Sequence, residues 1–400
     1  MNRDELLACY RDGLLNDTLP FWTQHAVDHQ NGGFLTALDR DGTVVDTDKS
    51  IWAQGRTTWL FGELYNRVEP REQWLKLARS GAEFLERHGF DPADGRMWFH
   101  VSRDGTPIRK RRYSYSECFA SIAFGELAQA TGEQRYFDLA QSTYQAFIEF
   151  ALEGNLPTGM TPKFTSHRPS VGLGGPMIAL VTTQELRESI NLEQADETID
   201  RCIELIADRH VNEELECVLE TATPDGQLID HFNSRTLNPG HAIEGAWFIM
   251  SEGHRRRRQD WIALGCKMLD WSWRVGWDGQ HGGLLYFVDA KGLPVQEYWH
   301  DMKFWWPHNE AIIATLMAYL LTGDDKYRRW HALVHQWSHQ YFADQEHGEW
   351  FGYLHRDGTV SSRLKGNLWK GPFHLPRMQL ECWQWLQTAN TILPGAFDSI

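Results

Sequence analysis

Three histidines follow short glycine-centred turns at nearly the same distance. His241 lies 15 residues after Gly226, and His308 and His374 each lie 16 residues after a comparable glycine. Histidine has an unperturbed pKa of about 6.5, so it can accept or donate a proton near neutral pH. Two converging histidines could carry out an epimerisation, in which one removes a proton beside a carbonyl and the other returns a proton to the opposite face.

Each histidine alone could equally be a capping or core residue, and it is the common offset that favours a shared site. His241 follows Asn238, Pro239 and Gly240, which predict a helix that starts with an asparagine cap and a first-turn proline. The positive end of that helix should favour the neutral imidazole. Glu244, three residues later on the same face, opposes this effect and could orient the ring.

Proton loss beside a carbonyl requires stabilisation of the enediolate oxygen that develops. Arg56 lies 14 residues after Gly42, and we assign it to that oxygen as a fixed cation. The alternative is an arginine buried in an ion pair with Glu63 or Glu117. The repeat also places Glu117 at an equivalent offset, which makes it a candidate for the substrate site.

A sugar-sized ligand needs aromatic walls and a few polar contacts. The candidate substrate-binding residues are Trp52, Tyr115, Glu117, Met177, Trp305, Trp306, His308 and Trp369. The segment Gly175-Pro176-Met177 could form an apolar wall for an N-acetyl group, and Lys163 or Asn309 could supply its polar contact.

The elements that must position these residues repeat along the chain. Gly42 and Gly105 are 63 residues apart, and Gly292 and Gly358 are 66 apart; such turns typically join hairpin strands. Prolines with a similar spacing begin helical patterns: Pro176, Pro239, Pro307 and Pro372. The segments 131–136 and 322–327 are alike and read as loops between paired helices.

Each repeat is therefore a short hairpin followed by two helices, and 400 residues hold about six of them. A linear solenoid is an alternative. Six units with aromatic-rich inner helices fit a closed ring better, so we predict an all-α (α/α)6 barrel with short hairpins at one end, formed by residues 1–400 as one domain. In such a ring His241 and His374 lie two units apart and approach the axis from different sides.

Composition narrows the function further. The chain is 42% hydrophobic and 23% charged, and 39 Lys and Arg against 54 Asp and Glu give a net charge of −15. This charge argues against nucleic acid or membrane surfaces as partners. Charged residues near the start, no long apolar run and six scattered cysteines predict a cytoplasmic protein without disulfides.

Other chemistries have weaker support. The glycine cluster at 172–175 lacks the GxGxxG pattern of dinucleotide-binding folds, and the basic run 255–258 reads as a solvated helix end. His331, His335 and His339 share a helix face, and two of them could hold a metal. No cysteine or carboxylate at a fixed spacing completes that set, so we expect a surface stripe and no metal site.

Four segments together are specific: KSIWAQGRTTWLFGELYN, NPGHAIEGAWF, WWPHNEAI and KGNLWKGPFHLPR. They resemble the N-acylglucosamine 2-epimerases, also called renin-binding proteins, from near residue 20 to near 390. The resemblance implies an (α/α)6 barrel that interconverts N-acetyl-D-glucosamine and N-acetyl-D-mannosamine without a cofactor for the chemistry. It also implies that Arg56 is the motif arginine, His241 and His374 are the acid/base pair, and Glu244 and Glu310 are assisting acids.

The family further implies a homodimer, and ATP as an allosteric activator that is not consumed. Relatives on the same scaffold act on cellobiose, mannose or sulfoquinovose, although the GPFHLPR form around His374 resembles the N-acyl branch more closely. A glycoside hydrolase or lyase would need two carboxylates beside a glycosidic bond, and Glu117 and Glu310 could be read that way. A protein-binding module would leave the shared histidine offset without a purpose.

Overall fold

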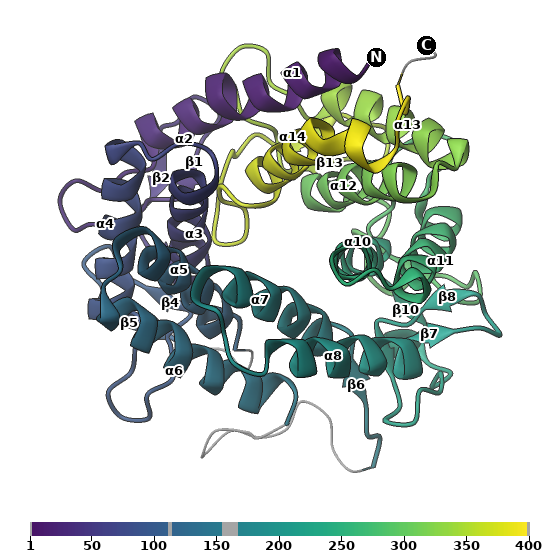
Figure 1. Ribbon diagram of the computed structural model, residues 1–400, viewed down its shortest axis with the longest axis horizontal. Coiled ribbons are helices and arrows are strands. Elements are labelled where there is room, and N and C mark those ends of the chain that lie inside the picture. Colours follow the sequence, from purple (N-terminus) through teal and green to yellow (C-terminus); the bar gives the residue numbers. More distant parts are fainter. Residues whose placement is uncertain (1, 111–113, 154–166, 398–400) are drawn as a thin grey trace.

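The computed structural model describes residues 2–110, 114–153 and 167–397. Its helices form two concentric rings (Figure 1). The inner ring consists of α3 (Ile51–Arg67), α5 (Tyr115–Thr131), α7 (Gly174–Ile190), α10 (Pro239–Arg255), α12 (Trp305–Thr322) and α14 (His374–Ile392). The outer ring consists of α1 (Arg3–Gly13), α4 (Glu72–His88), α6 (Gln134–Ala151), α8 (Ala195–Arg209), α11 (Gln259–Gly276) and α13 (Asp325–Tyr341). The predicted (α/α)6 barrel is thereby confirmed.

The two rings differ because their sequences bury different fractions of each helix. In α12 every residue from Trp305 to Leu320 is buried, as expected for a helix enclosed on all sides. In α4 burial is confined to one stripe that includes Trp74, Ala78 and Leu85, and the opposite face is polar. The helices that are buried on all sides therefore line the axis, and the amphipathic helices face solvent.

The chain closes the ring with its two ends. A π-helical turn η1 (Leu14–Thr18) and α2 (Leu19–His25) follow α1, which packs against α14. Leu6 and Tyr10 of α1 belong to the main hydrophobic core. Figure 1 shows α1 and α14 side by side beneath the N-terminus. The sixth pair thus combines the last helix with the first, rather than two consecutive helices as in the other units.

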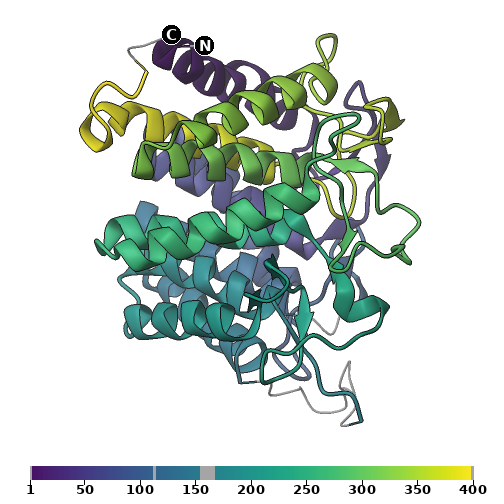
Figure 2. The same ribbon diagram turned by 90° about the vertical axis from the view of Figure 1, so that its right-hand side faces the viewer.

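Short antiparallel strands lie at one end of the barrel, on the right in Figure 2. Two sheets have three strands: β3 (Lys49–Ser50), β4 (His100–Val101) and β5 (Pro107–Arg109); and β12 (Lys303–Phe304), β13 (Tyr353–Leu354) and β14 (Val360–Ser362). The two-stranded pairs are β1 (Ala37–Leu38) with β2 (Val44–Asp46), β6 (Val171–Gly172) with β9 (Thr221–Ala222), β7 (Val211–Asn212) with β8 (Cys217–Val218), and β10 (Thr236–Leu237) with β11 (Val288–Asp289). A one-turn helix α9 (Phe232–Arg235) precedes β10.

The repeated turns need glycine because their backbone is left-handed. Gly42, Gly105, Gly226, Gly292 and Gly358 have φ angles of +85°, +92°, +81°, +70° and +89°, a region that side chains with a Cβ rarely adopt. Three of these turns join hairpin strands, β1 to β2, β4 to β5 and β13 to β14. The sequence repeat is therefore a repeat of backbone geometry.

The arginine of each Arg-Asp-Gly turn ties one repeat to its neighbour. Lys49 Nζ donates to Asp28 at 2.9 Å, and Arg103 of the next turn donates to the same carboxylate at 2.8 Å. The same trio recurs with Lys303, Asp278 and Arg356, and with Lys365, Asp344 and Arg40. Since Arg40 belongs to the first turn and Asp344 to a late repeat, the last of these trios closes the ring.

Within the described part of the chain, no helix is both long and apolar enough to span a bilayer.

Candidate active site

A cavity of about 1410 Å³ opens at the hairpin end and reaches down between the inner helices. Ten of the residues predicted for the site line it: Trp52, Arg56, Tyr115, Met177, His241, Glu244, Trp305, Trp306, Trp369 and His374. They come from α3, α5, α7, α10, α12 and α14, together with the segment before α14. All six inner helices therefore contribute to one chamber.

His241 lies in the first turn of α10, as predicted. Asn238 caps this helix, because its side chain accepts the backbone N–H of His241 at 3.2 Å. The ring Nδ1 lies 3.1 Å from both carboxylate oxygens of Glu220. A carboxylate only accepts, so Nδ1 carries the proton and Nε2 remains for the ligand.

The pKa of His241 is shifted in the direction opposite to that expected from the helix start alone. Burial is the largest influence and lowers this pKa, but the charge and hydrogen bond of Glu220, together with the charges of Glu244 and Glu310, outweigh it and raise the pKa above its ordinary value. The sequence did not point to Glu220, which lies between β8 and β9. The structure thus favours a protonated His241, where the helix dipole alone predicts a neutral one.

His374 is the first residue of α14 and is backed by Glu310, whose Oε1 accepts from Nδ1 at 2.7 Å. Glu310 is fully buried, and its other oxygen accepts from Trp247 Nε1 at 2.8 Å. Burial, helped by the positive charge of Arg377, holds the pKa of His374 well below its usual value. His374 is therefore a neutral imidazole with Nε2 as its basic nitrogen.

Arg377 connects the acidic residues of the site. Its Nη2 donates to Glu244 at 2.5 Å and to Glu310 at 2.7 Å. Glu244, which the sequence suggested could orient His241, instead pairs with this guanidinium. Glu244, Glu310 and His374 could hold a metal, but the cation among them is Arg377. Burial lowers the pKa of Arg377, and the charges and hydrogen bonds of Glu310 and Glu244 outweigh it and raise that pKa.

Trp306 lies beside both histidines. Its ring centroid lies 4.9 Å from that of His241 and 5.7 Å from that of His374. The helix order agrees, since α12 packs against both α10 and α14. The two imidazoles therefore line one cavity from two different helices, next to the same aromatic ring.

Arg56 lies against aromatic faces rather than against an acid. Its guanidinium carbon is 4.1 Å from the ring centroid of Phe119 and 4.6 Å from that of Phe373. Its buried Nε has no hydrogen-bond partner among the described residues, and burial lowers the pKa of Arg56 to about 10. The alternative ion pairs are absent from this part of the chain, because Glu63 pairs with Arg67 and Glu117 with Arg96.

Two predicted substrate-binding residues lie outside the cavity lining. Glu117 is 1% exposed and accepts from Arg96 Nε at 2.5 Å and from the backbone N–H of Met97 at 3.0 Å. His308 is fully buried and stacks on Trp337 of the outer helix α13, with ring centroids 4.8 Å apart. Both carry structural hydrogen bonds instead of facing a ligand.

The ring of His308 has no nitrogen left for chemistry. Nδ1 donates to Phe304 O at 2.7 Å, and Nε2 accepts the backbone N–H of Leu284 at 2.9 Å. Burial lowers the pKa of His308 to about 3. This histidine joins the hairpin end to α12 and stays neutral.

The predicted contacts for an N-acetyl group are only partly in place. Gly175, Pro176 and Met177 all line the cavity. Asn309 is fully buried and is not part of the lining, and Lys163 lies outside the described residues. The apolar wall is therefore present, and Asn309 is not its polar partner.

The histidine stripe of α13 is not on the surface. His331 and His335 are 4% and 7% exposed, because α1 covers this face of α13. A cysteine also joins the set, since Cys9 Sγ lies 3.7 Å from His339 Nε2. The expectation of a surface stripe is therefore wrong, and the cysteine comes from a distant part of the sequence.

Replacing Glu220 with Gln should make the enzyme lose activity at a lower pH on the alkaline side of its pH profile. The wild-type carboxylate keeps His241 protonated to higher pH, so its loss lowers that pKa and the alkaline limb of the kcat/KM profile moves to lower pH. The acidic limb, set by His374, should stay in place. Glu213→Gln, which alters an exposed residue of the neighbouring hairpin, is the matched control; an unmoved alkaline limb in Glu220→Gln would refute this role of Glu220.

The chain is similar to several known proteins. The family model described as N-acylglucosamine 2-epimerase (GlcNAc 2-epimerase) matches residues 32–374. The N-acylglucosamine 2-epimerase of Bos taurus is 37% identical over 410 residues, which cover 98% of this chain and 94% of the bovine protein. That of Homo sapiens is 36% identical over 381 residues, which cover 92% of this chain and 87% of the human protein.

Among solved structures, the cellobiose 2-epimerase from Bacillus thermoamylovorans has a TM-score of 0.83 at 23% identity and covers 95% of this chain and 99% of its own. At that identity the likeness concerns the fold. The segment matched by the family model contains Arg56, His241, Glu310 and His374.

Proposed function

Because this chain belongs to the N-acylglucosamine 2-epimerase family and is a carbohydrate epimerase, we propose that it interconverts N-acetyl-D-glucosamine and N-acetyl-D-mannosamine. The observation that carries the proposal is a pair of imidazoles that line one cavity from two different helices, α10 and α14. His241 and His374 both lie beside Trp306, and each has a carboxylate at Nδ1. This arrangement suits proton transfer at two faces of one carbon.

The proposed reaction begins with the open-chain sugar in the cavity. Nε2 of His374 removes the proton from C2, and the electron pair moves through the new C1–C2 double bond onto the carbonyl oxygen. Arg56 stabilises the negative charge on that oxygen. His241 then donates a proton from Nε2 to the opposite face of C2, and the carbonyl re-forms, so that only the configuration at C2 changes.

The opposite pKa shifts suit these two roles. His241, with a raised pKa, is the donor in the resting enzyme, and His374, with a lowered pKa, is the base. A positive charge on His241 lowers the pKa of His374 further, so the pair holds one proton. The reverse reaction starts from the other placement of that proton, and the two placements interconvert through solvent between turnovers.

The glutamates behind the histidines act as positioning residues. Glu310 is held by Trp247 and Arg377, so it keeps the His374 ring oriented through Nδ1. Glu220 does the same for His241 and also raises its pKa. Neither carboxylate has to reach the sugar in this mechanism.

The substrate preference rests on the wall formed by Met177 and its neighbours. The Met177 side chain packs against Gly245, one turn after His241 in α10, so this wall lies near the reacting carbon. An unmodified sugar would leave the space for the acetamido methyl unfilled.

We therefore expect kcat/KM for N-acetyl-D-mannosamine to be at least about 10-fold above that for D-mannose, which corresponds to about 1.4 kcal/mol. Initial rates on both sugars, and on cellobiose, measure this directly. Equal or better use of mannose or cellobiose would assign the chain to another substrate while leaving the two-histidine mechanism in place.

A hydrolase on the same barrel has weaker geometric support. Its acid pair would be Glu117 and Glu310, yet neither carboxylate lines the cavity and both are occupied by buried partners. A hydrolytic pair must flank the bond that is cleaved. A purely protein-binding role would give no purpose to the two cavity-lining imidazoles, or to a buried Arg56 whose Nε has no partner among the described residues.

The proposal includes a cytoplasmic homodimer that needs no cofactor for the chemistry and can be activated by ATP. The family resemblance is the basis for the dimer and for ATP. All six cysteines lie in the described part of the chain and are free thiols, which suits a reducing compartment. Sedimentation of the purified chain, and its turnover with and without ATP, address the assembly and the activation.

A further inference from the structure

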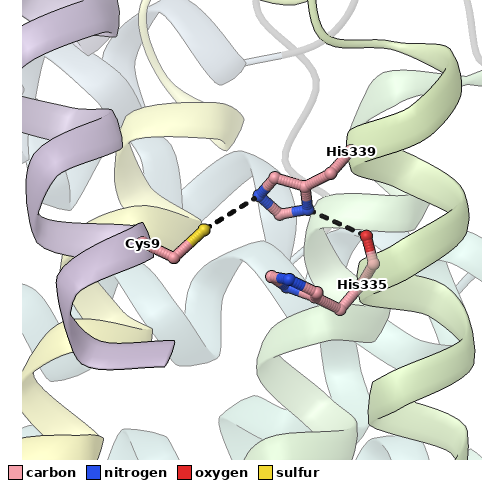
Figure 3. Close-up of side chains that lie close together, drawn as sticks. All are labelled: Cys9, His335 and His339. Atoms are coloured by element: carbon pink, nitrogen blue, oxygen red, sulfur yellow. Dashed lines mark hydrogen bonds between the residues drawn. The ribbon is translucent and has the colours of Figure 1, made fainter. Parts of the chain in front are cut away.

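A cysteine and two histidines lie close together where α1 packs against its outer-ring neighbour α13 (Figure 3). Cys9 projects from α1, and His335 and His339 lie one turn apart on α13. One potential ligand atom from each residue lies within 4.8 Å of the others. This cluster is separate from the cavity, since none of the three residues lines it.

The hydrogen bonds of His339 determine which nitrogen is basic. Nδ1 donates to the backbone carbonyl of His335 at 2.8 Å. A carbonyl oxygen only accepts, so Nδ1 carries the proton of the neutral ring. Nε2 therefore has a lone pair, and it faces Cys9 Sγ at 3.7 Å (Figure 3).

A chain of hydrogen bonds fixes His335 in the same way. His331 Nδ1 donates to Ile312 O at 3.1 Å, so its Nε2 must accept the Tyr10 hydroxyl proton at 3.1 Å. The Tyr10 oxygen then accepts from His335 Nδ1 at 2.8 Å. Because Nδ1 carries the proton of the neutral His335 ring, its Nε2 is left with a lone pair.

The distances suit a tetrahedral ion. Bonds of about 2.3 Å to sulfur and 2.0–2.1 Å to nitrogen at the tetrahedral angle place the two ligand atoms about 3.6 Å apart. Cys9 Sγ and His339 Nε2 are 3.7 Å apart. His335 requires only a small side-chain movement, because its ligand atom already lies within 4.8 Å of both.

We propose that Cys9, His335 and His339 form a binding site for a divalent cation of the zinc type. One thiolate and two neutral imidazoles are a donor set that Zn²⁺ prefers, and water would complete the tetrahedron. On binding, the Cys9 S–H bond breaks, its proton leaves to solvent, and the sulfur lone pair forms the bond to the metal. Cys9 and His339 are only half-buried, so solvent reaches the site.

Neighbouring groups already hold both imidazoles. The carbonyl of His335 accepts from His339 Nδ1, and the Tyr10 hydroxyl accepts from His335 Nδ1, which leaves the Nε2 atom of each ring for a metal. A metal here would join α1 to α13. Since α1 also supplies the outer helix of the last pair, the ion would stabilise the closure of the ring.

The test is a titration of tag-free, metal-stripped enzyme with Co²⁺, which reports thiolate ligation by a near-ultraviolet charge-transfer band. We expect one Co²⁺ per chain with this band, and displacement by Zn²⁺. Cys9→Ser should abolish the band and weaken binding at least ~10-fold, as should His339→Gln. Cys266→Ser, which changes another half-buried thiol, should behave as wild type.

The melting midpoint is a second measurement, which distinguishes the loss of a metal ligand from a general loss of folding in a variant. Zn²⁺ at about 100 times its dissociation constant should raise the wild-type melting midpoint by about 3 °C and that of Cys9→Ser much less. Circular dichroism and turnover of Cys9→Ser without metal confirm its fold. A thiolate band that survives in Cys9→Ser, or no stoichiometric binding to the wild type, would overturn the proposal.

Discussion

Replacing His374 or His241 with Asn should lower turnover by roughly 10² or more, the scale expected for loss of a general acid or base. Asn keeps a hydrogen-bonding side chain of similar size but cannot carry the proton. The fold should survive, because both rings lie at the cavity rather than in the core packing. Steady-state rates in both directions, with circular dichroism and the melting midpoint, provide the measurement.

The matched control is His254→Asn. His254 lies at the other end of α10 from His241 and is exposed, with its ring against Trp385. Its loss should leave turnover unchanged. If His241→Asn or His374→Asn kept near-normal turnover in either direction, the two-base assignment would be wrong.

Arg56→Met should separate activity from stability. The guanidinium is buried among aromatic rings without a carboxylate partner in the described chain, so it bears a desolvation cost that no ion pair offsets. A methionine of similar length should keep or raise the melting midpoint, while kcat falls by about 10²–10³ through loss of the charge that stabilises the enediolate.

Arg67→Met, on the same helix, should have the opposite effect: a lower melting midpoint with kcat retained. Arg67 pairs with the buried Glu63 at 3.0 Å, so its removal leaves a buried carboxyl without that partner and should lower the melting midpoint. Its guanidinium has no role in our mechanism, and kcat should be retained. An Arg56→Met enzyme that is destabilised but still turns over normally would contradict the oxyanion role.

The repeat could be predicted from sequence because its turns and helix starts require particular residue types. Glycine is needed where φ is positive, as at Gly42 and Gly358, and proline marks the helix start at Pro239. The pairing of α14 with α1 could not be predicted, since their contact joins the two ends of the chain and leaves no local signal.

The site was only partly predictable because an offset along the chain does not fix which way a side chain points. His308 shares its offset with His374, but it is the fourth residue of α12 whereas His374 is the first of α14. Each step around a helix turns by about 100°, so His308 faces the outer ring. Glu220 and Arg377 were missed because their roles depend on partners brought close by folding.

The cluster of Cys9, His335 and His339 also could not be predicted from sequence spacing alone. A spacing of four residues places His335 and His339 on one face, but only the fold shows that α1 buries this face and adds Cys9.

The most direct test of the central claim is a single turnover of protiated N-acetyl-D-mannosamine in D₂O, with the C2 position of the product read by NMR or mass spectrometry. In the proposed mechanism one of the two histidines removes the proton and the other supplies the new one from solvent. The N-acetyl-D-glucosamine formed should therefore carry deuterium at C2. Product that forms at the normal rate but retains protium at C2 would contradict a mechanism with two bases.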